Sequence, residues 1–414
     1  MDAGPSRSDS ANKIRTIYLV LTARCNLTCS YCFQNSKSNR RMSYGTAVAA
    51  VDLAFSSRQS QVKVEFFGGE PFLEFDLMRR TVDYAKRACP QEKSVTFGII
   101  TNGTLLRSEQ LSFLIENDFK VLLSFDGPPP AQDVRGRGTF APLDRLLDKL
   151  RNDYPHYLRS RFSISGTYTA STYHLMAGAL EYFLGKGVRS VYLTPVYTHD
   201  PTWRVDSLDV LEDQFQGMFQ ISKGHYECTG EVPYRIFSPD PHGDEHSPRG
   251  RTMCGVMRGE TPTVDVDGQV HGCATFAGSY QTFPSEFLRS RVESMSMGSI
   301  HDPDLQARYR AFPIAVREAG LFHQKHEKYS SLRKCAECEY LAECSVCPTS
   351  IGHIPGNQDP NRIPDSLCAF NLISLKYRAK FAEYLREATK PKTVYDFLFS
   401  AGQVSGGQRI GLKA

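Results

Sequence analysis

The sequence contains no stretch that approaches 18 consecutive apolar residues, so no segment is expected to span a membrane. Its first 13 residues are polar and lack the apolar core of a secretory signal. Charge of one sign is also missing: 49 basic residues face 45 acidic ones, and no basic run reaches five residues. Such a balance does not favour nucleic-acid binding. These absences predict a cytoplasmic protein that binds neither a membrane nor a nucleic acid.

What remains is the composition of a globular protein with one unusual feature. The 414 residues are 41% hydrophobic and 23% charged, which suffices for an ordinary core and two or three domains. Twelve of them are cysteines. Without an export signal these thiols should stay reduced, so clustered cysteines predict bound metal rather than disulfides. Ten of the twelve fall into clusters or ligand patterns, and only Cys89 and Cys228 stand apart.

The first 200 residues alternate between short β-branched runs and helical stretches. Strands are expected at 16–22, 62–67, 95–101, 120–125, 161–169 and 190–196. Helices are expected between them at 44–57, 77–88, 108–117, 141–152 and 173–185. This alternation predicts βαβ units with a parallel sheet, arranged either as an open doubly wound sheet or as a partial barrel.

The pattern changes after residue 200. A helix is expected at 205–221, a long loop at 225–251, short strands and turns from 254, and a closing helix at 377–389. The sequence therefore predicts five parts. They are a flexible N-terminus (1–14), the alternating α/β part (15–200), a bridging helix and loop (201–253), a cysteine-rich part (254–375), and a C-terminal helix and tail (376–414).

The first cysteine cluster directly follows the first expected strand. Cys25, Cys29 and Cys32 lie within eight residues, in the loop where parallel α/β folds build their sites. Three thiolates can hold a four-iron cluster and leave one iron without a protein ligand. The alternative is a structural zinc site, which needs a fourth ligand, and no His or Cys follows before Cys89.

The spacing C-x3-C-x2-C, with the aromatic Tyr31 before the last cysteine, resembles the signature of radical S-adenosylmethionine (SAM) enzymes. The resemblance implies a partial (β/α)6, TIM-like barrel, in agreement with the six expected strands. It also implies that SAM chelates the open iron, and that an electron from the cluster cleaves SAM to methionine and a 5′-deoxyadenosyl radical. The cysteines Cys25, Cys29 and Cys32 would then be the catalytic set.

Further elements at strand ends fit the same family and imply cofactor-binding residues. A GGEP element follows the second strand, and Asn102 ends the third. Ser124 and Asp126 stand in a Ser-x-Asp-Gly element after the fourth strand, and Thr194 lies late in the sixth, where it would line the adenine. The cofactor contacts implied by the resemblance are Tyr31, Gly68, Gly69, Glu70, Pro71, Asn102, Ser124, Asp126 and Thr194. Each of these strand-end elements can also be an ordinary turn.

Seven cysteines near the C-terminus resemble the SPASM extension, a cysteine-rich domain of short strands and helices with two auxiliary [4Fe–4S] clusters. They are Cys254, Cys273, Cys335, Cys338, Cys344, Cys347 and Cys368. One spacing departs from the family, since Cys344 and Cys347 are one residue closer than usual. The alternative is a zinc ribbon, although the five-residue gap between the two C-x2-C pairs is short for one.

The family arrangement implies which cysteines share a cluster. An outer cluster would use Cys335, Cys338, Cys344 and Cys368, and an inner one Cys254, Cys273 and Cys347. The inner cluster then lacks one ligand, so either Cys228 supplies it or one iron stays open. We expect the open iron. With the cluster at the first motif, the chain is expected to carry three [4Fe–4S] clusters.

The resemblance implies an enzyme that modifies peptides. We expect a radical SAM peptide maturase that abstracts hydrogen from a ribosomally made precursor and forms a thioether or carbon–carbon crosslink. The alternatives are an anaerobic sulfatase-maturating, formylglycine-forming enzyme and a non-catalytic iron–sulfur electron-transfer or binding protein. A flavodoxin- or ferredoxin-type electron donor is implied as a partner. Only 24 residues precede Cys25, so we expect either a separate peptide-recognition protein or direct reading of the leader peptide by this chain.

Overall fold

The computed structural model describes residues 12–238, 256, 259–278, 289, 296–318 and 325–388. Within this part, six strands alternate with helices over the first 200 residues, as the sequence predicts. The strands are β1 (Thr16–Val20), β2 (Gln61–Phe67), β3 (Ser94–Thr101), β4 (Lys120–Ser124), β5 (Phe162–Tyr168) and β6 (Val191–Pro195). All five neighbouring pairs from β1 to β6 are parallel and lie in chain order. The expected α/β partial barrel is therefore confirmed, and the open doubly wound alternative is wrong.

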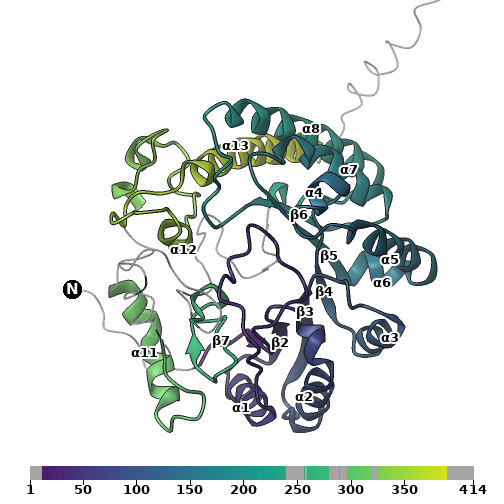
Figure 1. Cartoon of the computed structure of the whole chain (residues 1–414), viewed down its shortest axis with the longest axis vertical. Helices are drawn as coiled ribbons and strands as arrows, with labels where there is room; N and C mark the ends of the chain where they lie inside the picture. The colour runs from purple at the N-terminus through teal and green to yellow at the C-terminus, as the bar shows by residue number, and fades with distance from the viewer. Residues whose placement is uncertain are drawn as a thin grey trace, which may run out of the picture.

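The helices cover the outside of this curved sheet (Figure 1). The main ones of the first half are α1 (Tyr44–Phe55), α2 (Phe75–Ala88), α3 (Ser108–Glu116), α5 (Phe140–Asp153) and α7 (Met176–Gly185). Their apolar residues recur at helical spacing, as in α5, which buries Leu143, Leu146, Leu147 and Leu150. Three short helices punctuate the loops: η2 (Pro71–Glu74), α4 (Pro129–Gln132) and η3 (Tyr173–Leu175). The sequence analysis missed α6 (Pro155–Arg161), which starts with proline at a favoured first position.

Two short strands from the cysteine-rich part extend the barrel sheet. Strand β7 (Thr263–Val264) pairs in parallel with β1, and β8 (Val270–His271) pairs antiparallel with β7. The sheet thus has eight strands in the order β6-β5-β4-β3-β2-β1-β7-β8. The remaining elements of this part are η5 (Ala274–Phe276), α11 (Leu305–Glu318), η6 (Lys325–Glu327), η7 (Cys335–Glu337) and α12 (Pro348–Gly352).

Two long helices differ from the sequence expectation. Helix α8 (Ser207–Thr229) runs eight residues beyond the expected end and stops at Gly230, whose φ of 73° closes the helix in the left-handed conformation. A short turn, η4 (Arg235–Phe237), follows it. Helix α13 (Asp365–Ala388) begins twelve residues before the expected Tyr377. The expected boundary between 375 and 376 therefore falls inside a helix, and the expected loop from 225 begins inside α8.

Helices α8 and α13 join the two halves of the chain. They lie side by side at the top of Figure 1 and pack through edge-to-face aromatic rings, including Phe215 against Phe370 and Phe219 against Phe381. Among the described residues, no helix is both long and apolar enough to cross a lipid bilayer.

Candidate functional site

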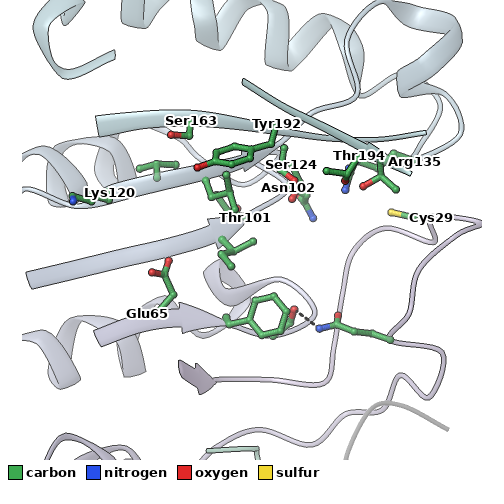
Figure 2. Close-up of a pocket in the computed structure, with 18 of the residues that line it drawn as sticks. Cys29, Glu65, Thr101, Asn102, Lys120, Ser124, Arg135, Ser163, Tyr192 and Thr194 are labelled. Atoms are coloured by element: carbon green, nitrogen blue, oxygen red, sulfur yellow. Dashed lines mark hydrogen bonds between the residues drawn. The ribbon is translucent and has the colours of Figure 1, made fainter. Parts of the chain in front are cut away.

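A cavity of about 930 Å³ lies inside the partial barrel. Figure 2 shows Cys29, Arg135 and Thr194 at one end of it and Lys120 and Glu65 toward the other. The sequence-predicted residues that line it are Cys25, Cys29, Tyr31, Cys32, Gly68, Gly69, Asn102, Ser124 and Thr194. Glu70, Pro71 and Asp126 do not line it. The structure therefore gathers most of the predicted site at one end of a single cavity.

The three motif cysteines sit in the loop that follows β1, at the carboxyl end of the sheet. Burial raises the pKa of the Cys25 thiol, and it raises that of Cys29 to about 11. The charge of Cys32 raises both pKa values further, so the three thiols lie within electrostatic reach of one another. Thiols must lose their protons to bind metal. Three neighbouring thiols at a cavity end fit the donor set of an iron–sulfur cluster.

The two glycines after β2 dock onto this cysteine loop through the backbone. Gly69 donates its N–H to the carbonyl of Thr22 at 2.9 Å, and Glu70 donates to the carbonyl of Arg24 at 2.9 Å. A Cβ on Gly69 would lie 1.9 Å from the Arg24 carbonyl oxygen. Gly68 has a φ of +141°, a backbone angle that residues with a side chain rarely adopt. Only glycine allows this close approach, so Gly68 and Gly69 set the distance between the cysteine loop and the turn after β2.

Glu70 faces the end of β3 instead of the cavity. Its carboxylate accepts hydrogen bonds from the Thr101 hydroxyl (2.7 Å), the Asn102 N–H (2.9 Å) and the Phe72 N–H (3.1 Å). Burial raises its pKa to about 7, against the opposing effect of these donors. The side chain therefore ties the GGEP turn to the end of β3. Pro71 starts the short helix η2 and is also buried.

Asn102 links the same strand end to the cysteine loop. Its amide nitrogen donates to the Asn26 side-chain oxygen at 2.9 Å and lies 3.9 Å from the sulfur of Cys25. The side chain is 7% exposed and lines the cavity. It is placed to orient the Cys25 thiol, a contact that motif matching alone does not specify.

Asp126 is fully buried beneath the cysteine loop. It accepts hydrogen bonds from Arg135 at 2.6 Å, from the Thr167 N–H at 2.8 Å and from the Tyr31 hydroxyl. The Arg135 guanidinium also lies 5.5 Å from the centre of the Tyr31 ring. In this structure Asp126 acts on the loop through Tyr31 and Arg135.

Arg135 is the main cavity residue that sequence reasoning missed. It is 9% exposed and lines the cavity near Cys29. Burial lowers the pKa of its guanidinium, but the charge of Asp126 helps to raise that pKa above its usual value. Arg137, two residues later, is exposed. The sequence carries no signal that separates these two arginines, because their difference in burial comes from the turn after α4.

The described C-terminal thiols fall into two groups. Burial raises the pKa of Cys335, as do the charges of Cys368 and Cys338. Burial raises that of Cys344 to about 11, with added effects of Cys335 and Cys368. Cys335, Cys338, Cys344 and Cys368 therefore lie together, and we call them the outer thiol group. Burial raises the pKa of Cys347, a hydrogen bond from Thr349 opposes this, and the thiol that contributes to the rise is Cys273 instead. The described thiols thus divide in the way that the resemblance implies, and the ligand sets of the two clusters stay a prediction.

Cys254, the third expected inner ligand, lies outside the described residues. Among the residues that the structure does describe, no three His, Cys, Asp or Glu side chains converge on a point that would hold a single metal ion. Assignment of clusters to these thiols therefore rests on the motifs and on the grouping of the thiols.

The two cysteines outside the motifs lie away from these groups. Cys228 is exposed near the end of α8, and the neighbouring Glu227 contacts Tyr384 late in α13. Cys368 stands near the start of α13, sixteen residues or about 24 Å of helix away. Cys89 ends α2 and packs against the core. The structure thus places neither beside the outer thiol group.

Comparisons with known proteins agree with the motifs. Residues 19–160 match the family model described as the radical SAM superfamily. An uncharacterized protein of Methanocaldococcus jannaschii is 32% identical over 43% of this chain and 61% of its own length. A cysteine-type anaerobic sulfatase-maturating enzyme of Clostridium perfringens is 27% identical over 42% of this chain and 50% of its own length. The chain thus spans between half and two thirds of these two relatives.

Solved structures share the fold over most of the chain. The structure "Native anSMEcpe with bound AdoMet and Kp18Cys peptide" matches with a TM-score of 0.67 and 17% identity, over 90% of this chain and 99% of that one. "Crystal structure of Streptococcus suis SuiB bound to precursor peptide SuiA" matches with a TM-score of 0.52 and 16% identity, over 87% and 77%. These likenesses extend beyond the barrel into the cysteine-rich part.

Proposed function

We propose that this chain, which contains a radical SAM domain and is an enzyme of the radical SAM class, is a maturase that modifies a ribosomally made precursor peptide. The observation that carries the proposal is the gathering of three motif thiols at one end of a cavity of about 930 Å³. Cys25, Cys29 and Cys32 would hold the cluster that SAM chelates. When bound, this pair supplies a 5′-deoxyadenosyl radical by reductive cleavage of SAM.

Several residues of this chain are suited to bind SAM and to protect the radical. The buried Arg135 at the cavity wall complements a carboxylate such as that of SAM. Gly68 and Gly69 bring backbone close to the cysteine loop, where carbonyl groups can accept from an ammonium. Ser124 and Thr194 line the wall as neutral hydrogen-bonding groups. Buried strands around the cavity restrict water, which protects a radical from quenching.

The peptide substrate is supported by the structural neighbours. Two solved structures with this fold hold peptides, one of them the precursor peptide SuiA. We propose hydrogen abstraction from one residue of such a peptide, followed by formation of a thioether or carbon–carbon crosslink. Two auxiliary [4Fe–4S] clusters would be held by the outer and inner thiol groups, and a flavodoxin- or ferredoxin-type protein would supply electrons. A separate recognition protein for the peptide is part of the proposal.

A second candidate is maturation of sulfatases by formylglycine formation. It is favoured by the sequence relative from Clostridium perfringens, which bears that name, and by its share of 42% of this chain. The two reactions differ in their products. A crosslink removes two hydrogen atoms and keeps the sulfur, whereas formylglycine formation from cysteine removes two hydrogen atoms and also replaces the sulfur with oxygen.

The first experiment is anaerobic incubation of reconstituted protein with SAM and dithionite, with 5′-deoxyadenosine as the readout. We expect product from the wild type, none from the triple variant Cys25→Ala, Cys29→Ala, Cys32→Ala, and an unchanged amount from the control Cys89→Ala. The intact chain should hold about twelve irons in three clusters. The triple variant should keep the iron of the two auxiliary clusters. Stoichiometric zinc without the visible absorbance of iron–sulfur clusters would overturn the cluster assignment.

The second experiment separates the two substrates. The protein is incubated with a precursor peptide encoded beside its gene and, separately, with a cysteine peptide from a sulfatase, and the products are weighed by mass spectrometry. We expect loss of two hydrogens from the precursor and no exchange of sulfur for oxygen. The opposite pattern would establish the sulfatase alternative, and cleavage of SAM with neither peptide changed would reject both substrates.

A further inference from the structure

Two side chains outside the cysteine motifs donate hydrogen bonds to sulfurs of the outer thiol group. Arg333 Nη1 lies 3.6 Å from the sulfur of Cys338. Asn371 Nδ2, one turn after Cys368 on α13, lies 3.5 Å from the sulfur of Cys344 and also donates to the Ser345 carbonyl at 3.0 Å. The two donors come from different elements, one from the turn before η7 and one from helix α13.

Arg333 can interact with the outer thiol group through more than one hydrogen bond. Its Nε is buried and has no hydrogen-bond partner among the described residues. Its charge acts on Cys335 and Cys368, so it reaches three of the four thiols. A guanidinium kept beside thiols, with no carboxylate as its ion-pair partner in the described part of the chain, is suited to a group that carries negative charge.

Two lysines add to this positive environment. Lys325 donates to the carbonyl of Cys344 at 2.5 Å, and Lys328, which is 7% exposed, carries charge that acts on Cys335. A four-iron cluster held by four thiolates is anionic, and reduction adds one more negative charge. Donors to the sulfurs and nearby cations stabilise the reduced form more than the oxidised form.

We infer that Arg333 and Asn371 are positioning residues that raise the reduction potential of the cluster held by the outer thiol group. The inference rests on the proposed function, because it needs a cluster at Cys335, Cys338, Cys344 and Cys368. Each residue acts on a different sulfur, so their effects should add. An outer cluster raised in this way accepts electrons more readily than it would with unbonded sulfurs.

The test is a redox titration of the reconstituted full-length protein, followed by electron paramagnetic resonance. The signal of the outer cluster is identified by its loss in Cys338→Ala. We expect Arg333→Gln to make reduction roughly tenfold less favourable, a shift of about 59 mV to lower potential for a one-electron couple. Asn371→Leu, of similar shape, should shift the potential in the same direction by a smaller amount, and the double variant by the sum.

A matched control separates hydrogen bonding from general charge. Lys334 is adjacent to Arg333 and exposed, and its charge does not contribute to the shifted pKa of Cys335. Lys334→Gln removes the same charge and should leave the potential unchanged. Arg333→Lys keeps the charge but loses the planar, forked set of N–H donors of the guanidinium, so it should shift the potential by less than Arg333→Gln. The Arg333→Lys variant also tests the inference if Arg333→Gln does not fold.

The outcomes distinguish this inference from the proposed function. An unchanged potential in Arg333→Gln and Asn371→Leu, with full iron content, would overturn the inference and leave the clusters in place. An equal shift in Lys334→Gln would also overturn it. Wild-type protein that holds no cluster at the outer thiol group, judged by no loss of iron in Cys338→Ala, would instead refute the proposed clusters, and the inference with them.

Discussion

The buried pair Asp126–Arg135 allows the most direct test of how the cysteine loop is held. The side chains are 0% and 10% exposed, and their closest nitrogen–oxygen distance is 2.6 Å. Asp126→Asn keeps the volume but leaves the Arg135 guanidinium without its counter-ion. Breaking one partner of a buried ion pair costs about 3–5 kcal/mol. The entropy of unfolding grows with chain length, so for 414 residues each kcal/mol shifts the midpoint of thermal unfolding by about 1 °C, and the midpoint should fall by roughly 3–6 °C.

The loss should also reach the cluster site, because the Tyr31 hydroxyl donates to the same carboxylate. Tyr31 stands between Cys29 and Cys32, so a loosened Tyr31 exposes the first cluster to attack. We expect Asp126→Asn to release iron to a chelator faster than the wild type under anaerobic conditions. The readouts are circular dichroism during heating and the rate of coloured chelate formation.

Two further variants make this prediction refutable. Arg135→Met should also destabilise, but the double variant should cost roughly 2 kcal/mol less than the sum, because it leaves no unpaired charge. The matched control is the exposed pair Asp118–Arg161, where Asp118→Asn should cost about 1 kcal/mol or less. Strict additivity of the buried pair, or equal effects of Asp126→Asn and Asp118→Asn, would show that burial of the ion pair does not anchor the loop.

Three other predictions follow from single contacts. Gly69→Ala should lose the iron of the first cluster and SAM cleavage, because its Cβ would lie 1.9 Å from a backbone oxygen, whereas Gly178→Ala, with open space around it, should retain both. Glu70 binds its proton more tightly when folded, with a pKa raised from 4.5 to about 7, so its contribution to stability is present at low pH and lost as pH rises through 7. Between pH 5 and pH 8, wild-type thermal stability should therefore fall relative to Glu70→Gln, by up to about 3 kcal/mol, and a constant difference would contradict this. Cys228→Ala should keep all its iron in elemental analysis, since Cys228 is exposed near the end of α8 and we expect the inner cluster to keep one open iron, and loss of one cluster's iron would mean that the thiol is a ligand.

The fold was predictable from sequence to the extent that periodic patterns control it. Six β-branched runs at regular spacing gave six parallel strands, with ends within a few residues of the expected ones. The missed elements had local signals that the pattern search did not use. Pro155 opens α6, and Gly230 ends α8 with a positive φ. Pro364 directly precedes α13, and proline is common at the start of a helix.

The sequence predicted where the motif residues stand along the chain but not where their side chains point. Gly69 and Asn102 line the cavity because strand ends have fixed positions in a parallel sheet. Motif matching could not tell that the side chains of Glu70 and Asp126 turn inward, because that depends on donors such as Thr101 and Arg135 from other elements. The spacing of a motif fixes backbone position, and tertiary contacts decide where each side chain points.

The position of the outer thiol group follows from helix packing rather than from its cysteine loop. Cys368 lies in the first turns of α13, and later turns of the same helix press Tyr377 and Phe381 against α8. Tyr377 also donates to Glu212 of α8 at 2.7 Å. Because α8 packs in turn on α7 of the barrel, the apolar core of the barrel extends to Phe370 near the start of α13. Cys368 itself packs in a separate small cluster with Ile351 and Ile363. Helix α13, held against α8, therefore helps to set the separation between Cys368 and the cysteine loop.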